Sequence, residues 1–129
     1  MSSASATFDL PPTAAAVPAA RHLVGALLRV WQSPHDHDDA ALLVTELVSN
    51  VVDHVGGEAD LTVEVSLAEA WLRIAVVDGS AIRPVVRELS MGHPRGRGLQ
   101  MVQSIADRWG VEDHDGGKRI WLELRPAGL

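Results

Sequence analysis

The pair Gly56-Gly57 separates two parts of the chain whose apolar residues follow different periods. Before the pair, from about residue 38 to residue 55, apolar residues recur at the spacing of an α-helix, which the glycines would end. After the pair, residues 61–67 and 71–78 alternate between apolar and polar side chains, which predicts the two strands of a β-hairpin. Helices and antiparallel strands in one short chain predict an α+β domain.

Two further elements are predicted ahead of this point. Residues 18–31 have apolar side chains at helical spacing, and Pro18 suits the first turn of a helix. The sequence ATFDL, which precedes Pro11-Pro12, is compatible with a short edge strand. Residues 1–7 are small and mostly polar, and we expect them to be disordered and the folded domain to extend over residues 8–125.

The second half of the chain contains a long irregular stretch and three more elements. Residues 79–96 have no regular period and carry two prolines and three glycines, and loops of this length usually serve as lids or binding loops. A helix is predicted over residues 98–109, followed by a hairpin of WGVEDHD and KRIWLELR across the glycine pair between them. The order of elements predicts a two-layer α/β sandwich with the helices on one face of the sheet.

Composition excludes several classes of protein. A chain of 129 residues with 47% hydrophobic and 22% charged residues is typical of one globular domain. The net charge of −6 and the lack of a basic run argue against nucleic-acid binding. The chain has no cysteine, so a disulfide or a catalytic thiol is excluded. The sequence shows no signal peptide and no apolar run long enough to span a membrane, so we expect a cytoplasmic location.

The sequence ELVSNVVDH places several chemically versatile side chains on one helical stripe. Glu46, Asn50 and His54 are spaced four residues apart, and Asp53 lies beside the last two. The opposite side of this helix is apolar, so by pattern alone the stripe is the solvated face of an amphipathic helix and requires no function.

Two glycine-containing sequences add to this observation. In VVDGS, Asp78 ends a strand, where its carboxylate can accept a hydrogen bond from an amine and Gly79 lets a flat ring approach; a simple turn acid is the alternative. In GRGLQMV, Gly96 and Gly98 begin a helix, whose free N–H groups suit an anion. Each pattern is weak evidence by itself.

The order of these three patterns is more specific. A helix with ExxxNxxxH, a strand ending in Asp-Gly and a GxGL helix entry resemble the N-box, G1 box and G2 box of the histidine-kinase-like ATPase superfamily. Within it, ELVSNVVDH, VVDGS, GRGLQMV, ADRWGV and GGKRIWLEL are similar to the anti-sigma-factor serine kinases of actinobacteria. The resemblance covers about residues 8–124 and implies a sandwich of the Bergerat type, with a mixed, mostly antiparallel sheet.

The resemblance implies a role for each matching residue. Asn50 would be a ligand of the magnesium ion that bridges the phosphates, and an oxygen ligand suits this cation. Glu46 would act as general base. Asp53 and His54 would lie toward the ribose and adenine and contribute packing or water contacts rather than catalysis. Asp78 would bind the adenine amine. The other nucleotide-binding residues implied are Gly79, Arg95, Gly96, Arg97, Gly98, Leu99 and Gln100.

Two departures from the family pattern weaken the expected nucleotide affinity. The G1 box lacks the second glycine, since Asp78 and Gly79 are followed by Ser80-Ala81. The last hairpin has Arg119 where a hydroxyl residue commonly assists the adenine-binding aspartate. We expect Arg119 to face solvent or to pair with an acid, since an arginine cannot replace a short donor.

A cluster of histidines and aspartates at residues 35–39, HDHDD, suggests a metal site. Its residues are adjacent in sequence and do not share a helical face, whereas a zinc site needs convergent ligands. Capping of the following helix is the better explanation.

The resemblance implies an ATP-dependent and magnesium-dependent serine/threonine protein kinase. Its phosphoacceptor would be an anti-sigma-factor antagonist, and it would also bind a sigma factor or a similar regulatory protein. The alternative is a catalytically weak or inactive nucleotide-binding module that acts only by sequestering a protein. The sequence is compatible with a homodimer. We expect neither nucleic acid nor a membrane as a partner.

Overall fold

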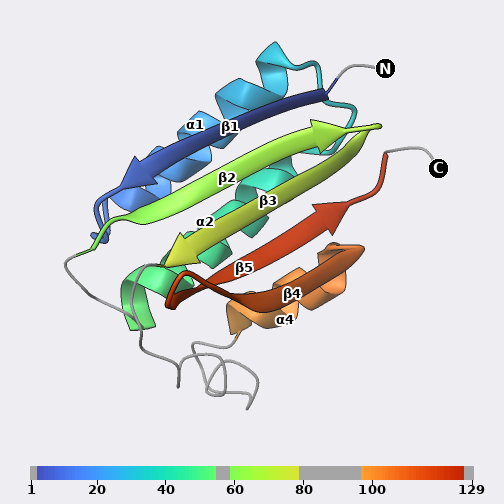
Figure 1. Cartoon of the computed structure of the whole chain (residues 1–129). Coiled ribbons are helices and arrows are strands. Elements are labelled where there is room, and N and C mark those ends of the chain that lie inside the picture. Colours follow the sequence, from blue (N-terminus) through green and yellow to red (C-terminus); the bar gives the residue numbers. More distant parts are fainter. Residues whose placement is uncertain (1–2, 55–58, 79–96, 127–129) are drawn as a thin grey trace.

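The computed structural model describes residues 3–54, 59–78 and 97–126, with the backbone alone for residues 54 and 97–100. Two layers are visible in Figure 1: a five-stranded sheet in front and the described helices behind it. The elements in chain order are β1 (Ser3–Leu10), α1 (Ala16–Val30), α2 (His37–His54), β2 (Leu61–Ala68), β3 (Trp71–Asp78), α4 (Arg97–Ile105), β4 (Arg108–His114) and β5 (Gly117–Leu124). The predicted two-layer α+β sandwich is confirmed.

The strands have the order β1-β2-β3-β5-β4, and every described pairing is antiparallel. The last hairpin joins the sheet through β5, which leaves β4 at the edge. Because β5 runs antiparallel to β3, the start of β5 lies beside the end of β3, and Asp78 pairs with Lys118. This topology places two charged residues from distant parts of the chain side by side.

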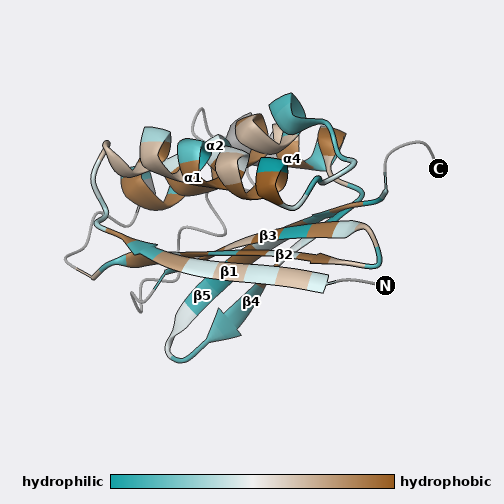
Figure 2. Cartoon of the chain, turned by 90° about the horizontal axis from the view of Figure 1, so that it is seen from above, coloured by the Kyte–Doolittle hydropathy of each residue, from teal (hydrophilic) through white to brown (hydrophobic). Residues whose placement is uncertain are grey.

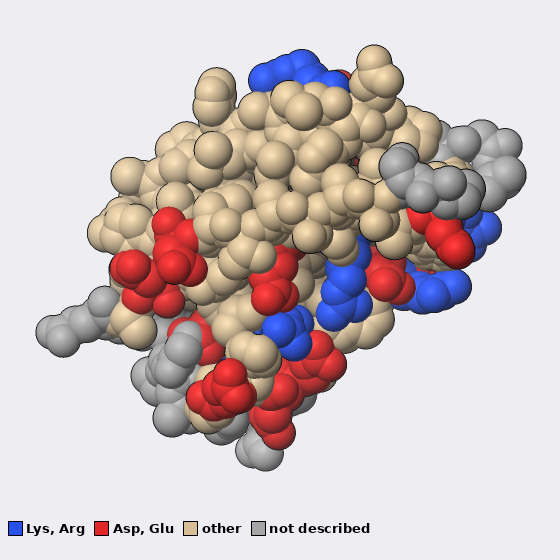
Figure 3. Space-filling model, turned by 45° about the horizontal axis from the view of Figure 1, so that its top comes forward, with Lys and Arg blue, Asp and Glu red and all other residues tan. Residues whose placement is uncertain are grey.

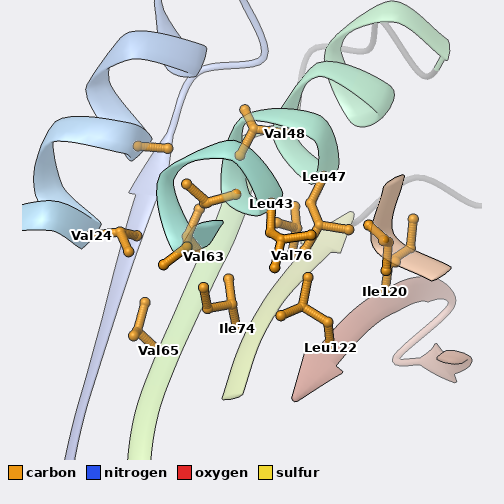
Figure 4. Close-up of a cluster of buried hydrophobic side chains, with 14 of the residues drawn as sticks. Val24, Leu43, Leu47, Val48, Val63, Val65, Ile74, Val76, Ile120 and Leu122 are labelled. Carbon is orange, nitrogen blue, oxygen red and sulfur yellow. The ribbon is translucent and has the colours of Figure 1, made fainter. Parts of the chain in front are cut away.

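The hydrophobic core fills the space between the two layers, where the apolar colours of Figure 2 face one another. Alternate residues of each central strand point toward the helices, as period-two patterning requires. Figure 4 shows these side chains meeting the apolar side of α2 and Val24 of α1. The fully or nearly fully buried core includes Val24, Leu43, Leu47, Val48, Val63, Val65, Ile74, Val76, Ile120 and Leu122.

The first strand is longer than its sequence suggests. Residues 3–7, which were expected to be disordered, belong to β1 and pair with β2 from Ser3 to Leu10. Ala4, Ala6 and Phe8 are half-buried toward the helices, while the serines and threonine between them are exposed. Small side chains gave no apolar signal, but the backbone hydrogen bonds of the sheet ladder do not depend on side-chain size.

The third described helix is shorter than predicted. It ends at Ile105, and Trp109 lies in β4 instead. The reason is local, because the N–H of Asp107 already donates to the carbonyl of Glu123 in β5, at 2.9 Å. The carboxylate of Asp107 accepts two further hydrogen bonds from Arg125, each of 2.8 Å. These hydrogen bonds hold Asp107 beside the end of β5, so the helix ends before this residue.

The hairpin turn between β4 and β5 also differs by one residue from the expected glycine pair. The turn is formed by Asp115 and Gly116, both at positive φ, and Gly117 already belongs to β5. Positive φ at two central residues is the geometry of a tight hairpin turn, for which Asp-Gly is a favoured sequence.

The cluster at residues 35–39 caps a helix, as predicted. The carboxylate of Asp36 accepts the backbone N–H groups of Asp38 and Asp39, at 2.9 and 3.0 Å, at the start of α2. His35 is buried, and its ring nitrogens lie 2.7 Å from the Ser33 hydroxyl and 3.2 Å from the carbonyl of Leu124. Within the described ranges, no group of three or more acidic, histidine or cysteine side chains could hold a metal ion.

Candidate functional site

The residues of the polar stripe of α2 differ in their exposure to solvent. Asn50 is buried, Glu46 one turn earlier is half-buried, and Asp53 is exposed. His54 is the last residue of α2, and its side chain lies outside the description. The other side of α2 is fixed by core packing, so the stripe is held in one orientation relative to the sheet.

Asn50 is the residue of this stripe with unfilled hydrogen-bonding capacity. Among the buried side-chain nitrogen and oxygen atoms of the described residues, Nδ2 of Asn50 is the one without a hydrogen-bond partner. An unsatisfied buried amide costs about 1–3 kcal/mol, so proteins retain one mainly where a ligand or water completes it.

The donor set on α2 fits a magnesium ion bound together with phosphates. Mg²⁺ prefers oxygen ligands, keeps several waters and is usually held by one or two protein side chains plus substrate phosphates. The carboxamide of Asn50 offers one such oxygen, while its Nδ2 could donate to a phosphate or to a metal-bound water.

Asp78 and Lys118 form a buried ion pair at the end of the sheet. The ammonium Nζ of Lys118 lies 2.8 Å from Oδ2 of Asp78, and the two side chains are 3% and 6% exposed. Both project from the inner face of the sheet, continuing the rows of core residues that include Val76 and Ile120. The aspartate therefore meets a cation from the last hairpin.

This pairing corrects the sequence-based expectation for Arg119. Arg119 pairs with Val77 across the strands and lies on the opposite face of the sheet from Asp78. Its guanidinium donates to Glu64 at 2.9 Å and to Glu112 at 3.0 Å, and these hydrogen bonds raise the pKa of Arg119. Neighbouring residues of a strand point to opposite faces of the sheet. The alternation of apolar residues from Ile120 onward could therefore have assigned Lys118 to the inner face.

The outer face of the sheet carries a network of ion pairs. Arg119 links Glu64 and Glu112, and Arg73 lies 3.6 Å from Glu123. The guanidinium of Arg73 also lies over the ring of Trp121, 4.7 Å from its centre. Figure 3 shows acidic and basic side chains interleaved on one face of the molecule. Such exposed pairs contribute little individually and leave this face mixed in charge.

The remaining candidate residues lie around the start of α4. Arg97, Gly98, Leu99 and Gln100 form its first turn, where backbone N–H groups lack helical partners. The helix packs against α2, with Val102 buried in the interface region. Gly79, Arg95 and Gly96 lie outside the described residues, as does the rest of the irregular stretch at residues 79–96, including the lid expected at residues 81–95.

The elements named so far meet at one end of the sandwich. In Figure 1 the C-terminal end of α2, the end of β3 and the start of β5 lie close together, and α4 begins nearby. The structure therefore brings Asn50 and Asp78 to the same end of the molecule, together with Lys118, which the sequence analysis had missed.

Comparison with known proteins agrees with this geometry. The sequence profile of the histidine kinase-like ATPase domain matches residues 10–124. The chain belongs to the histidine kinase-like ATPase family. An uncharacterised protein of Streptomyces coelicolor is similar in sequence. It is 33% identical to this chain over 88 residues, which cover 66% of this chain and 82% of the relative.

Two solved structures share the fold of this ATPase domain. The RsbU and RsbW domains of Rv1364c from Mycobacterium tuberculosis match with a TM-score of 0.68 and 22% identity, over 95% of this chain and 32% of that one. The histidine kinase domain of a blue-light activated histidine kinase from Erythrobacter litoralis matches with a TM-score of 0.54 and 22% identity, over 70% of this chain and 45% of that one. The chain thus spans less than half of either solved protein.

None of the described helices of this ATPase domain is both long and apolar enough to cross a membrane.

Proposed function

We propose that this ATPase domain binds ATP with Mg²⁺ at the end of the sandwich where α2, β3, β5 and α4 meet. We propose further that it transfers the γ-phosphate to a serine or threonine of a partner protein, an antagonist of an anti-sigma factor. The observation that carries the proposal is the buried, incompletely hydrogen-bonded amide of Asn50 on α2, at the same end of the fold as Asp78.

The residues of α2 act on the phosphate side. The Asn50 oxygen would hold the metal ion, which would supply positive charge beside the transferred phosphoryl group. Glu46 precedes Asn50 by one helical turn and remains half-buried, so its carboxylate accepts the proton of the attacking hydroxyl group. Asp53 and His54, at the end of the helix, lie toward the ribose and contribute water contacts or packing.

The residues after β3 and at the start of α4 hold the rest of the nucleotide. Asp78 accepts a hydrogen bond from the exocyclic amine, and Gly79 admits the base to the backbone. The phosphates meet the free N–H groups at the helix start, to which the two arginines add positive charge. The residues in this group are Arg95, Gly96, Arg97, Gly98, Leu99 and Gln100.

The proposed protein partners are supported by the fold-level likeness to a chain that contains an RsbW domain. We propose a sigma factor or a similar cytoplasmic regulator as the bound partner and an anti-sigma-factor antagonist as the phosphoacceptor. A second function is favoured by the ion pair of Asp78 with Lys118, because it engages the base-binding carboxylate. In that case the protein is a catalytically weak nucleotide-binding module that acts by sequestration.

Phosphate transfer tests the first function directly. The full chain is incubated with γ-labelled ATP, Mg²⁺ and purified candidate antagonist proteins encoded near it in the genome. We expect label on a serine or threonine of one antagonist, and its loss when Glu46 is replaced by glutamine while ATP binding persists. Binding of ATP without transfer to any antagonist would favour the sequestration function.

A further inference from the structure

The ion pair at the end of the sheet has properties that packing alone does not explain. Lysine and aspartate are almost never fully buried unless they are paired, and removing both charges from water is costly even then. Here the side chain of Lys118 is 3% exposed and that of Asp78 is 6% exposed, next to the core residues Val76 and Ile120. Two apolar residues at these positions would extend the core at lower cost.

The ammonium group of Lys118 has more donors than the pair uses. An ammonium has three N–H donors, and within the described part of the chain its hydrogen bond goes to Oδ2 of Asp78, at 2.8 Å. A buried donor that remains unused is destabilising, so a further acceptor is expected at this position. The pair lies at the end of the sheet where β3 ends at Asp78, and it therefore borders the proposed nucleotide site.

We propose that Lys118 contacts the base and determines which base the site accepts. The inference rests on the proposed nucleotide binding. Asp78 fixes the ammonium group, which donates a hydrogen bond to the ring nitrogen N1 of adenine, while the carboxylate of Asp78 accepts from the neighbouring exocyclic amine. On adenine the acceptor N1 adjoins the donating exocyclic amine. This edge matches the donor of Lys118 and the acceptor of Asp78, which lie 2.8 Å apart. A carboxylate alone would recognise the amine only.

Two ATP analogues separate the two contacts in the unmodified protein. In 1-deaza-ATP the nitrogen N1 is replaced by C–H and the amine is kept, whereas purine riboside triphosphate keeps N1 and lacks the amine. We expect Mg-1-deaza-ATP to bind about tenfold or more weakly than Mg-ATP in calorimetry, the range for a hydrogen bond from a charged donor. Purine riboside triphosphate should retain measurable binding through Lys118.

Variants at position 118 assign the difference to the lysine. Lys118→Met keeps the length of the side chain and removes the donor, so it should bind ATP and 1-deaza-ATP equally. Lys118→Arg keeps a cation beside Asp78 and should retain part of the discrimination. Circular dichroism and the thermal midpoint show whether each variant is folded, and the analogue comparison in the wild type decides the question if Lys118→Met is not.

The outcomes are distinct. Equal affinities of the wild type for ATP and 1-deaza-ATP would overturn the role of Lys118 and leave the proposed nucleotide binding intact. Tighter ATP binding by Lys118→Met, without discrimination in the wild type, would mean that the lysine competes with the base for Asp78, and would also overturn it. If no nucleotide binds the wild type, the proposed function fails and this inference fails with it.

Discussion

Replacing Asn50 with alanine is expected to stabilise the nucleotide-free protein and to abolish its stabilisation by Mg-ATP. The side chain is 5% exposed and its Nδ2 lacks a hydrogen-bond partner among the described residues. Removing an unsatisfied amide relieves about 1–3 kcal/mol. Alanine also exceeds asparagine in helix propensity by roughly 0.5 kcal/mol. Lost packing contacts oppose these gains, by about 1–2 kcal/mol for a few buried atoms.

The net change in the free energy of unfolding lies between about −0.5 and +2.5 kcal/mol, which corresponds to roughly −2 to +10 °C in the thermal midpoint of a domain of this size. The effect of the ligand is separate. At a hundred times its dissociation constant, a ligand adds about 2.7 kcal/mol to the stability of the wild type, or roughly 10 °C. This increment should disappear in Asn50→Ala.

Differential scanning fluorimetry and chemical denaturation, each with and without Mg-ATP, measure both quantities. Ser49→Ala is the matched control, since Ser49 is the neighbouring half-buried position on the same helix and should keep the full ligand increment. An Asn50→Ala protein that is less stable than the wild type by more than 1 kcal/mol, or that is stabilised by Mg-ATP as the wild type is, would refute the reasoning.

Three further predictions concern other parts of the molecule. Asp78→Asn should weaken adenine nucleotides selectively, because the amide can present a donor to a donating amine; unchanged affinity in calorimetry would make Asp78 a structural residue only. Burial lowers the pKa of His35, so the unfolded chain binds the proton more readily, and stability should be full above about pH 6.5 and fall as the pH decreases through the lowered pKa. In His35→Gln the free energy of unfolding, measured by chemical denaturation at a series of pH values, should fall less over this range. The same pH dependence in the variant and the wild type would contradict the role of His35. A Cβ on Gly110 would lie 2.9 Å from the ring of Trp121, so Gly110→Ala should lower the free energy of unfolding by about 1–3 kcal/mol. Gly25→Ala in α1 is the control and should not destabilise the protein, because its Cβ would meet only the flexible end of Arg29, at 3.5 Å.

Most of the fold was predictable because its elements carry their own periodicity. The strands β2 and β3 and the helix α2 have clear patterns, and their bounds agree with prediction to within a residue or two. Residues 3–5, which lengthen β1 beyond the predicted ATFDL strand, were not predictable, since serine and alanine carry almost no hydrophobic signal. The end of α4 depends on hydrogen bonds between Asp107 and β5, which are contacts distant in sequence.

The candidate site was predictable where the motif itself contains the chemistry. Asn50 and Asp78 stand at the positions that their motifs indicated, and the burial of Asn50 agrees with a role beyond a solvated stripe. The partner of Asp78 was assigned wrongly by one residue: the alternation of β5 places Lys118, not Arg119, on the inner face beside Asp78. Arg119 was expected to face solvent or to pair with an acid, and its bonds to Glu64 and Glu112 confirm the second alternative.

Nucleotide binding at the end of the sandwich is tested most directly by a nuclear magnetic resonance titration of the ¹⁵N-labelled full chain with ATP, in the presence and absence of Mg²⁺. We predict that Mg-ATP shifts the side-chain amide of Asn50 and the backbone amides of Asp78, Lys118 and residues 97–100. The Asn50 shift should require Mg²⁺, while signals from the outer face of the sheet, such as Arg73, stay unchanged. Saturating Mg-ATP that leaves the Asn50 and Asp78 signals in place would contradict the account.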